Sequence, residues 1–170
     1  KGIICPLINT KEDCEEFLQS CYYPPQGIRS YGPTLAALNN DKYFSSSKNE
    51  IMSIIMLETR ESVINLNEIL KLPLLDTIYV GPFDLSISYG KSPDVIFKSN
   101  KMKKIYQEIL TKVKKARKLA AIHCTSAETA VKFLKMGFDF VTLSTDIGLL
   151  KSSLEREQEK VKKFIKNDIM

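Results

Sequence analysis

Two acidic side chains in this sequence follow apolar runs at a spacing that could place them at one cation. Glu58 ends the run IMSIIMLE, and Asp84 follows DTIYVGPF. If both runs are neighbouring parallel strands, about 4.8 Å apart, the two carboxylates can converge on one hard divalent cation and leave positions for water and substrate oxygens. The alternative is that each acid caps the helix that follows its strand. The spacing alone leaves both interpretations open.

The elements that would position these acids alternate along the chain. Apolar runs predict strands over residues 2–8, 51–58, 74–80, 119–124 and 138–145. Segments with helical spacing and capping residues follow, over 10–23, 59–72, 94–118, 125–137 and 146–167, and a long segment rich in Pro and Gly (24–47) is expected to be a functional loop. Repeated β–α units predict a parallel sheet, either open or closed into a barrel, with its chemistry at the C-terminal strand ends.

Composition excludes several classes of protein. The 170 residues are 44% hydrophobic and 26% charged, which is typical of a globular domain and not of a disordered chain. No apolar run approaches the roughly 20 residues of a membrane helix, and the lysine-rich segment 98–118 lacks the interleaved aromatics of a nucleic-acid surface. The four cysteines form no CxxC pair, so we expect no zinc site and a reducing, cytoplasmic location.

Three motifs together carry a resemblance to a known family. They closely resemble signatures of the HpcH/HpaI aldolases: YYPPQGIRSYGP (22–33), IMLETRE (55–61) and YVGPFDLSISYG (79–90). The likeness extends from ICPLINTKEDCEEF to STDIGLL. The resemblance implies an α/β fold that is a partial TIM (β/α)8 barrel. Because a complete barrel takes about 250 residues, the chain is expected to be a single incomplete domain over 1–170, holding approximately the fourth to eighth β–α units.

The resemblance also implies an activity and a set of site residues. It implies a metal-dependent class II aldolase, a lyase that reversibly cleaves 4-hydroxy-2-oxo acids to pyruvate and an aldehyde through a metal-stabilised enolate. Glu58 and Asp84 match the two carboxylates that hold Mg²⁺, Mn²⁺ or Co²⁺. Gly81 and Phe83 match the turn whose backbone amides help to bind the carboxylate of pyruvate.

The chain departs from the family pattern in what it lacks. The catalytic histidine and the pyruvate-binding arginine of the family belong to units that are absent here, so the general base cannot be placed. The sequence is therefore expected to be either a fragment of a longer protein or a truncated homologue that serves in assembly or 2-oxo acid binding. Met56 stands where relatives usually have glutamine, and a thioether cannot donate a hydrogen bond.

Two further residues have both a functional and a structural interpretation. His123, at the end of the run LAAIHC, could move protons near an enolate, although a lone histidine is more often a hydrogen-bonded structural residue. Arg29 could bind an anion or clamp its own loop, and the clamp is favoured. Asp146 matches an aspartate of the family pattern, but its place as a helix N-cap explains it sufficiently.

The expected partners follow from the resemblance and from the incomplete barrel. They are a small 2-oxo acid and an aldehyde, with no nucleic acid and no membrane. A five-stranded parallel sheet leaves two open edges, so a homo-oligomer, hexameric or built from dimers, is expected, and the helix from Ile147 could be exchanged between subunits. A lyase of the same superfamily acting on citryl- or malyl-thioesters is the weaker alternative.

Overall fold

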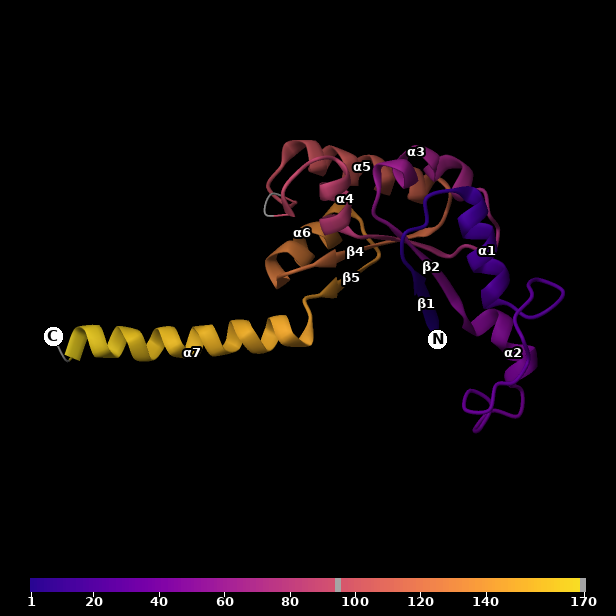
Figure 1. Ribbon diagram of the computed structural model, residues 1–170, viewed down its shortest axis with the longest axis horizontal. Helices are drawn as coiled ribbons and strands as arrows, with labels where there is room; N and C mark the ends of the chain where they lie inside the picture. Colours follow the sequence, from indigo (N-terminus) through magenta and orange to yellow (C-terminus); the bar gives the residue numbers. More distant parts are fainter. Residues whose placement is uncertain (94–95, 169–170) are drawn as a thin grey trace.

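A computed structural model describes residues 1–93 and 96–168, in which helices follow the strands of a parallel sheet (Figure 1). In chain order the elements are β1 (Gly2–Cys5), α1 (Lys11–Cys21), α2 (Tyr43–Glu50), β2 (Met52–Leu57), α3 (Arg60–Ile69), β3 (Thr77–Val80), α4 (Pro82–Ser88), α5 (Asn100–Lys115), β4 (Leu119–Cys124), α6 (Ala127–Met136), β5 (Phe140–Leu143) and α7 (Asp146–Asp168). The alternation of strand and helix predicted from the sequence is confirmed.

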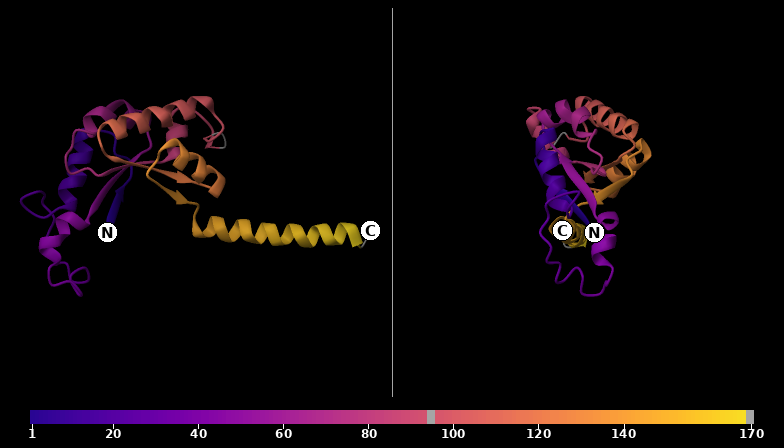
Figure 2. Two further views of the ribbon diagram at one scale, coloured as in Figure 1. Left: turned by 180° about the vertical axis from the view of Figure 1, so that it is seen from behind. Right: turned by 90° about the vertical axis from the view of Figure 1, so that its right-hand side faces the viewer.

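The sheet is a curled, open half-barrel. Its strand order is β1-β2-β3-β4-β5, and every neighbouring pair is parallel. Parallel neighbours joined through helices place all five C-terminal ends at one edge of the sheet. Within the described residues β1 and β5 each pair on one side only, so the expected open edges are present (Figures 1 and 2).

The two faces of the sheet have different partners. Alternate strand residues, among them Ile55, Ile78 and Ile122, pack with α1, α3, α5 and α6 in the main core. On the other face a smaller cluster of Ile54, Tyr79 and Ala121 is buried, with further partly buried side chains against it. This second face is concave, and it is the inner face of the half-barrel (Figure 2).

Several predicted bounds differ in the structure, and β1, β3 and β5 are shorter than the runs 2–8, 74–80 and 138–145. The segment 24–47, expected to be a loop, includes the first five residues of α2, whose helical turns run from Tyr43 to Glu50. The short helix α4 after β3 was not expected, because Gly81 and Pro82 indicate a turn; Pro82 instead occupies the first helical position, where no amide donor is needed. The helix expected over 94–118 occupies Asn100–Lys115 as α5, and residues 94–95 lie outside the described residues.

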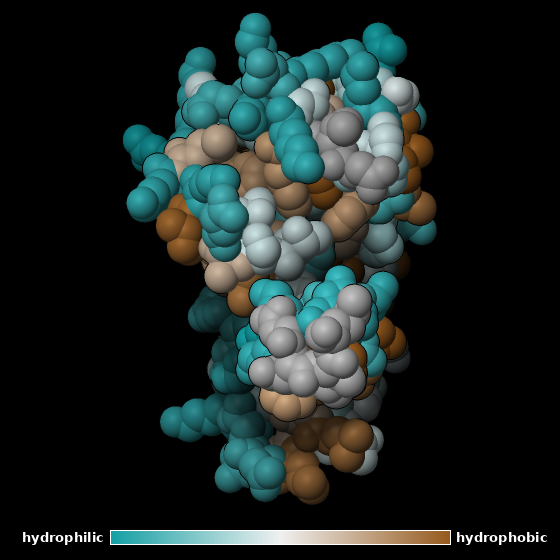
Figure 3. Space-filling view, turned by 90° about the vertical axis from the view of Figure 1, so that its left-hand side faces the viewer, coloured by the Kyte–Doolittle hydropathy of each residue, from teal (hydrophilic) through white to brown (hydrophobic). Residues whose placement is uncertain are grey.

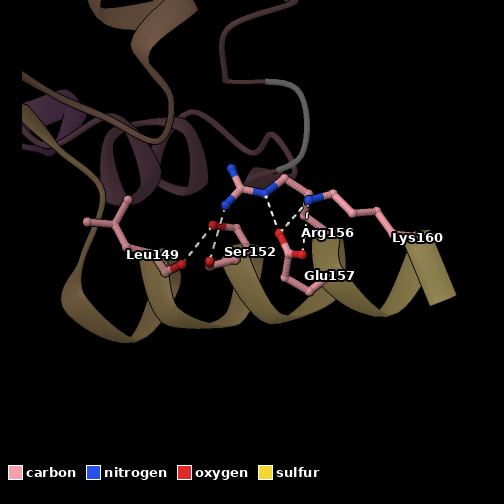
Figure 4. Close-up of polar contacts among 6 residues, drawn as sticks. Leu149, Ser152, Arg156, Glu157 and Lys160 are labelled. Carbon is pink, nitrogen blue, oxygen red and sulfur yellow. Dashed lines mark hydrogen bonds and ion pairs between the residues drawn. The ribbon is translucent and has the colours of Figure 1, made fainter.

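Helix α7 stands apart from the rest of the molecule. It extends away from β5 in both side views (Figures 1 and 2). Its N-cap is Thr145, whose Oγ1 accepts the Gly148 amide at 3.0 Å, and not Asp146 as expected. The ion pairs of α7 join residues of the same helix, such as those of Glu157 with Arg156 and Lys160 (Figure 4). Viewed along α7 in Figure 3, hydrophobic and hydrophilic residues are exposed side by side on the surface. None of the helices in the described part of the chain combines the length and apolar character needed to cross a bilayer.

Candidate metal centre

The strand register brings three side-chain positions to the inner face at the C-terminal edge of the sheet. Near the C-terminal ends of β2, β3 and β4 the register aligns three residues that are fully buried in the main core: Leu57, Val80 and Ile122. Successive residues of a strand point to opposite faces, so the next residues, Glu58, Gly81 and His123, face the concave side. Gly81 lies between the other two, and its N–H donates to the Leu57 carbonyl at 3.2 Å.

Glu58 is a buried carboxylate with a backbone partner. Its side chain is 4% exposed, and its Oε1 accepts a hydrogen bond of 2.7 Å from the backbone N–H of Leu7, just beyond β1. Leu7 adopts a left-handed conformation (φ 55°) that aims this amide at the carboxylate. Burial raises the pKa of Glu58, the Leu7 amide opposes that shift, and the negative charge of Asp84 raises the pKa further.

The charge of Asp84 acts on Glu58, which is consistent with the two carboxylates lying at the same end of the sheet. Asp84 lies in the first turn of α4, is exposed, and does not cap that helix, whose N-cap is Gly81 with no side-chain capping bond. Glu58 does not cap α3 either, because the Oγ1 of Thr59 accepts the Ser62 amide as the cap. The capping alternative is therefore wrong for both acids, and the two carboxylates remain available to a common ligand.

Gly81 is required by the close approach of Glu58. A Cβ atom at position 81 would lie 2.8 Å from Glu58 Oε2, 3.0 Å from Glu58 Cβ and 3.3 Å from Met56 Cγ. The first separation is shorter than real Cβ contacts and the other two are tight, so a larger residue at position 81 would require the Glu58 carboxylate to move. The same contacts place the Met56 thioether beside Glu58, as its position two residues earlier in β2 predicts.

The donor set fits a hard divalent cation that keeps water ligands. Mg²⁺ in proteins is commonly held by one or two carboxylates plus waters and substrate oxygens. Among residues 1–93 and 96–168, no group of three or more His, Cys, Asp or Glu side chains has metal-binding geometry, so a cation here would have Glu58 and Asp84 as its side-chain ligands. A buried carboxylate with a raised pKa is a group whose ionised form a cation would stabilise.

His123 is linked to two other polar side chains on the inner face. Its Nδ1 lies 2.9 Å from the Oγ1 of Thr142, its partner on β5, and Thr142 Oγ1 lies 2.5 Å from the hydroxyl of Tyr79. Burial lowers the pKa of His123, which favours the neutral ring. The ring of Phe83, in the first turn of α4, lies 6.1 Å from the imidazole between centroids. The predicted substrate-binding turn and His123 are therefore adjacent.

Comparison with known proteins shows which family the chain belongs to. A family model for HpcH/HpaI aldolase/citrate lyase matches residues 1–153. The chain belongs to this family. A hydroxypyruvate/pyruvate aldolase of Rhizorhabdus wittichii is 31% identical over 89% of the chain and 61% of its own length. A 2-keto-3-deoxy-L-rhamnonate aldolase of Klebsiella pneumoniae is 27% identical, over 92% of the chain and 59% of the relative.

Solved structures of HpcH/HpaI proteins have the same fold. A family member from Burkholderia cenocepacia J2315 superposes with a TM-score of 0.86 at 21% identity, over 95% of this chain and 65% of that one. The half-barrel thus matches about two thirds of that family member's chain. The chain spans about three fifths of the length of the curated relatives that it matches.

Arg29 of the YPPQGIR motif lies at the opposite end of the sheet from the two carboxylates. It belongs to the segment between α1 and α2, at the end of the sheet where strands begin, and it lines a cavity of about 590 Å³ together with Lys1 and Gly2. Its guanidinium Nη2 donates to the Tyr43 hydroxyl at 3.2 Å, and its Cζ lies 4.7 Å from the centre of the Tyr23 ring. Arg29 therefore has a structural role, as favoured, but its partners are tyrosine side chains and not the loop carbonyls and acids that the clamp interpretation expected.

Two features of this HpcH/HpaI site were missed from the sequence. The Leu7 amide that orients Glu58 depends on a left-handed leucine, for which the residue type gives no signal. The Tyr79–Thr142–His123 chain had a signal, since Tyr79 and Thr142 interrupt apolar strands at alternate positions that share a face with His123. Their contact requires the β4–β5 register, which the sequence does not specify.

Proposed function

We propose that this chain carries the metal-binding half of a class II aldolase site, which reversibly cleaves 4-hydroxy-2-oxo acids to pyruvate and an aldehyde. The observation that carries the proposal is the electrostatic pairing of Asp84 with a buried Glu58, for whose carboxylate Gly81 makes room. A divalent cation held there, Mg²⁺, Mn²⁺ or Co²⁺, would supply Lewis-acid polarisation of the 2-oxo acid. The aldolase names of the relatives support the same reaction class.

The residues of this chain have distinct roles in the proposed site. Glu58, oriented by the Leu7 amide, and Asp84 hold the cation. In the turn from Gly81 to Phe83 the Gly81 amide donates to the Leu57 carbonyl and Pro82 has no amide, so the Phe83 amide, which is in the first turn of α4, would bind the carboxylate of the substrate. His123 borders this turn from β4 and is in reach of the same ligand.

A second candidate is a homologue that binds 2-oxo acids or serves in assembly without catalysis. Met56 favours it, because a thioether beside Glu58 offers no polar contact to the ligand. Here too the 170 residues are proposed to be one incomplete domain, comprising the fourth to eighth units of a barrel. The exposed α7 supports assembly with further copies of the chain, and we place the protein in the cytoplasm because its four cysteines are free.

Exchange of the methyl protons of pyruvate with deuterated buffer separates the candidates. We would follow it by mass spectrometry with Mg²⁺, using the 170-residue chain, an N-terminally extended form, and Asp84→Asn in the extended form. Exchange that requires metal and is lost in Asp84→Asn supports the aldolase. Asp146→Asn is the matched control, since Asp146 is also an exposed acid in the first turn of a helix after a strand.

The negative outcomes are equally distinct. An extended chain that binds pyruvate with Mg²⁺ but exchanges its protons no faster than buffer and metal alone would favour the non-catalytic homologue. An extended chain that neither binds nor exchanges pyruvate would contradict both the aldolase and a homologue that binds 2-oxo acids, and would favour a role in assembly.

A further inference from the structure

The hydrogen-bonded chain on the inner face fixes which nitrogen of His123 carries the proton. Tyr79 is 6% exposed, and the described residues offer its hydroxyl no hydrogen-bond partner other than Thr142. A phenol is a stronger acid than an alcohol, so Tyr79 donates and Thr142 Oγ1 accepts. The single proton of Thr142 then goes to its other neighbour, Nδ1 of His123, at 2.9 Å.

With Nδ1 occupied as an acceptor, a neutral His123 carries its proton on Nε2. The opposite tautomer would have Nδ1 donate to Thr142 and Thr142 donate to Tyr79, which would leave the buried Tyr79 proton without an acceptor. Tyr79 and Thr142 thus prepare His123 as a neutral donor. Nε2 has no partner among the described residues, and the ring lies beside Phe83 at the proposed substrate turn.

The position of this donor decides which part of a 2-oxo acid it meets. The proposed cation ligands Glu58 and Asp84 belong to the ends of β2 and β3, whereas His123 lies on β4, on the other side of Gly81 from Glu58. A 2-oxo acid that chelates through its keto and carboxylate oxygens turns that edge to β2 and β3. Its opposite edge, which includes the carbon next to the keto group, faces β4.

We propose that His123 is a specificity-determining residue whose Nε2–H donates a hydrogen bond to a hydroxyl group on the carbon next to the keto group, so that the site prefers 3-hydroxy-2-oxo acids to pyruvate. The inference rests on the proposed function, which it narrows to one substrate class. A neutral donor suits an uncharged hydroxyl, and a site built to hydrogen-bond a hydroxyl rejects the analogue that lacks it. Tyr79 and Thr142 are positioning residues, because they act through the imidazole.

The first test reads the tautomer and needs no activity. Nitrogen-15 NMR of the imidazole in the full-length protein should show Nδ1 as the unprotonated nitrogen and Nε2 as the protonated one at neutral pH. His123 is the only histidine of these 170 residues. In a longer form of the protein that contains other histidines, the signals that are lost in His123→Gln are those of His123. In Thr142→Val the preference for the Nε2–H form should be lost, and Thr142→Ser should restore it. Protonation at Nδ1 in the parent protein overturns the inference.

The second test compares two ligands that differ by one hydroxyl group. Calorimetric titrations of the full-length protein with 3-hydroxypyruvate and with pyruvate, both with Mg²⁺, should show a preference of about tenfold for 3-hydroxypyruvate. His123→Leu should abolish the preference by weakening the binding of 3-hydroxypyruvate, while His123→Gln, which offers an amide donor, should retain part of it. An equal ratio in the parent and His123→Leu proteins overturns the inference alone. Failure of the parent protein to bind either acid overturns the proposed function as well.

Discussion

The backbone N–H of Leu7 donates a 2.7 Å hydrogen bond to Oε1 of Glu58 and so joins the ends of β1 and β2. The bond depends on the left-handed conformation of Leu7, whose side chain is 61% exposed. A leucine in this region costs of order 1 kcal/mol, and it persists here with its amide directed at a buried carboxylate. The arrangement holds Glu58 in place before any ligand arrives, which reduces the ordering that binding would require.

Glu58→Gln is expected to stabilise the metal-free protein. Burial and the charge of Asp84 both raise the pKa of Glu58, which means that its ionised form is unfavourable in the folded chain. Glutamine keeps a carbonyl that can accept the Leu7 amide and removes the charge. We expect a rise in melting temperature of about 2–4 °C, equivalent to about 1 kcal/mol for a domain of this size, together with loss of Mg²⁺ binding. A lower melting temperature would contradict this account of Glu58.

The same residue predicts a pH dependence. An acid with a raised pKa binds its proton more tightly in the folded than in the unfolded chain, so its contribution to stability is full below the ordinary glutamate pKa and falls as pH rises through the folded value. The gain in melting temperature of Glu58→Gln over the parent should therefore be larger near pH 7 than near pH 4. Thermal melts of both proteins without metal, at matched pH, measure this difference, and a gain that is constant with pH would speak against it.

Gly81→Ala should weaken both the fold and the cation site. The added Cβ would lie 2.8 Å from Glu58 Oε2, so the carboxylate must move away from the position that Leu7 orients. Forcing a group into a packed site typically costs about 1–3 kcal/mol. Chemical denaturation and Mg²⁺ titration measure the two losses. Gly32→Ala is the matched control, since no atom lies within 4 Å of the Cβ it would add.

Addition and removal of Mg²⁺ should change the thermal stability reversibly. A ligand that binds only the folded chain stabilises it by about 2.7 kcal/mol at a hundredfold excess over its dissociation constant. We expect Mg²⁺ to raise the melting temperature of the parent protein and EDTA to return it to the metal-free value. Asp84→Asn should abolish the response and Asp146→Asn should retain it. An undiminished response in Asp84→Asn would exclude Asp84 as a ligand.

Helix α7 should mediate self-association through one face. Four apolar residues of α7 are 47–72% exposed: Leu150, Leu154, Val161 and Ile165. They lie along one side of the helix because they are separated by four, seven and four positions. Leu154→Asp should reduce the molar mass in size-exclusion light scattering to a smaller assembly. Ser152→Asp introduces the same charge on the other side of α7 and should leave the mass unchanged. Equal masses for all three proteins would show that this face does not join subunits.

Much of the fold was predictable because local patterns determine it. The apolar runs predicted all five strands, and threonine and serine residues at helix starts cap α1 and α6 as expected. Helix α4 was missed because the pair Gly81–Pro82 is compatible both with a turn and with the start of a helix. Residues that pack on the segment decide between them, and Leu85 is fully buried in the main core.

The positions of single site residues at strand ends were predictable from the sequence, whereas contacts between residues of different strands were not. Glu58 and Asp84 follow apolar runs, so their position at the edge of the sheet could be read from the sequence, and the structure gives the two an electrostatic interaction. The roles of Gly81, Phe83 and His123 remain predictions. The Leu7 contact and the Thr142 bridge join residues 51 and 19 positions apart, and such pairs depend on register and backbone conformation.

The order of strands has a consequence for how the chain acquires its structure. Within residues 1–93 and 96–168, each strand is hydrogen-bonded only to the strands that come immediately before and after it in the sequence. The pairing of these strands therefore requires no residues from a distant part of the chain, and β2 can pair with β1 before β3 has left the ribosome. N-terminal segments emerge and fold first during synthesis, so the sheet can assemble in the order of translation, with Glu58 in place against Leu7 before the residues of β4 have been made.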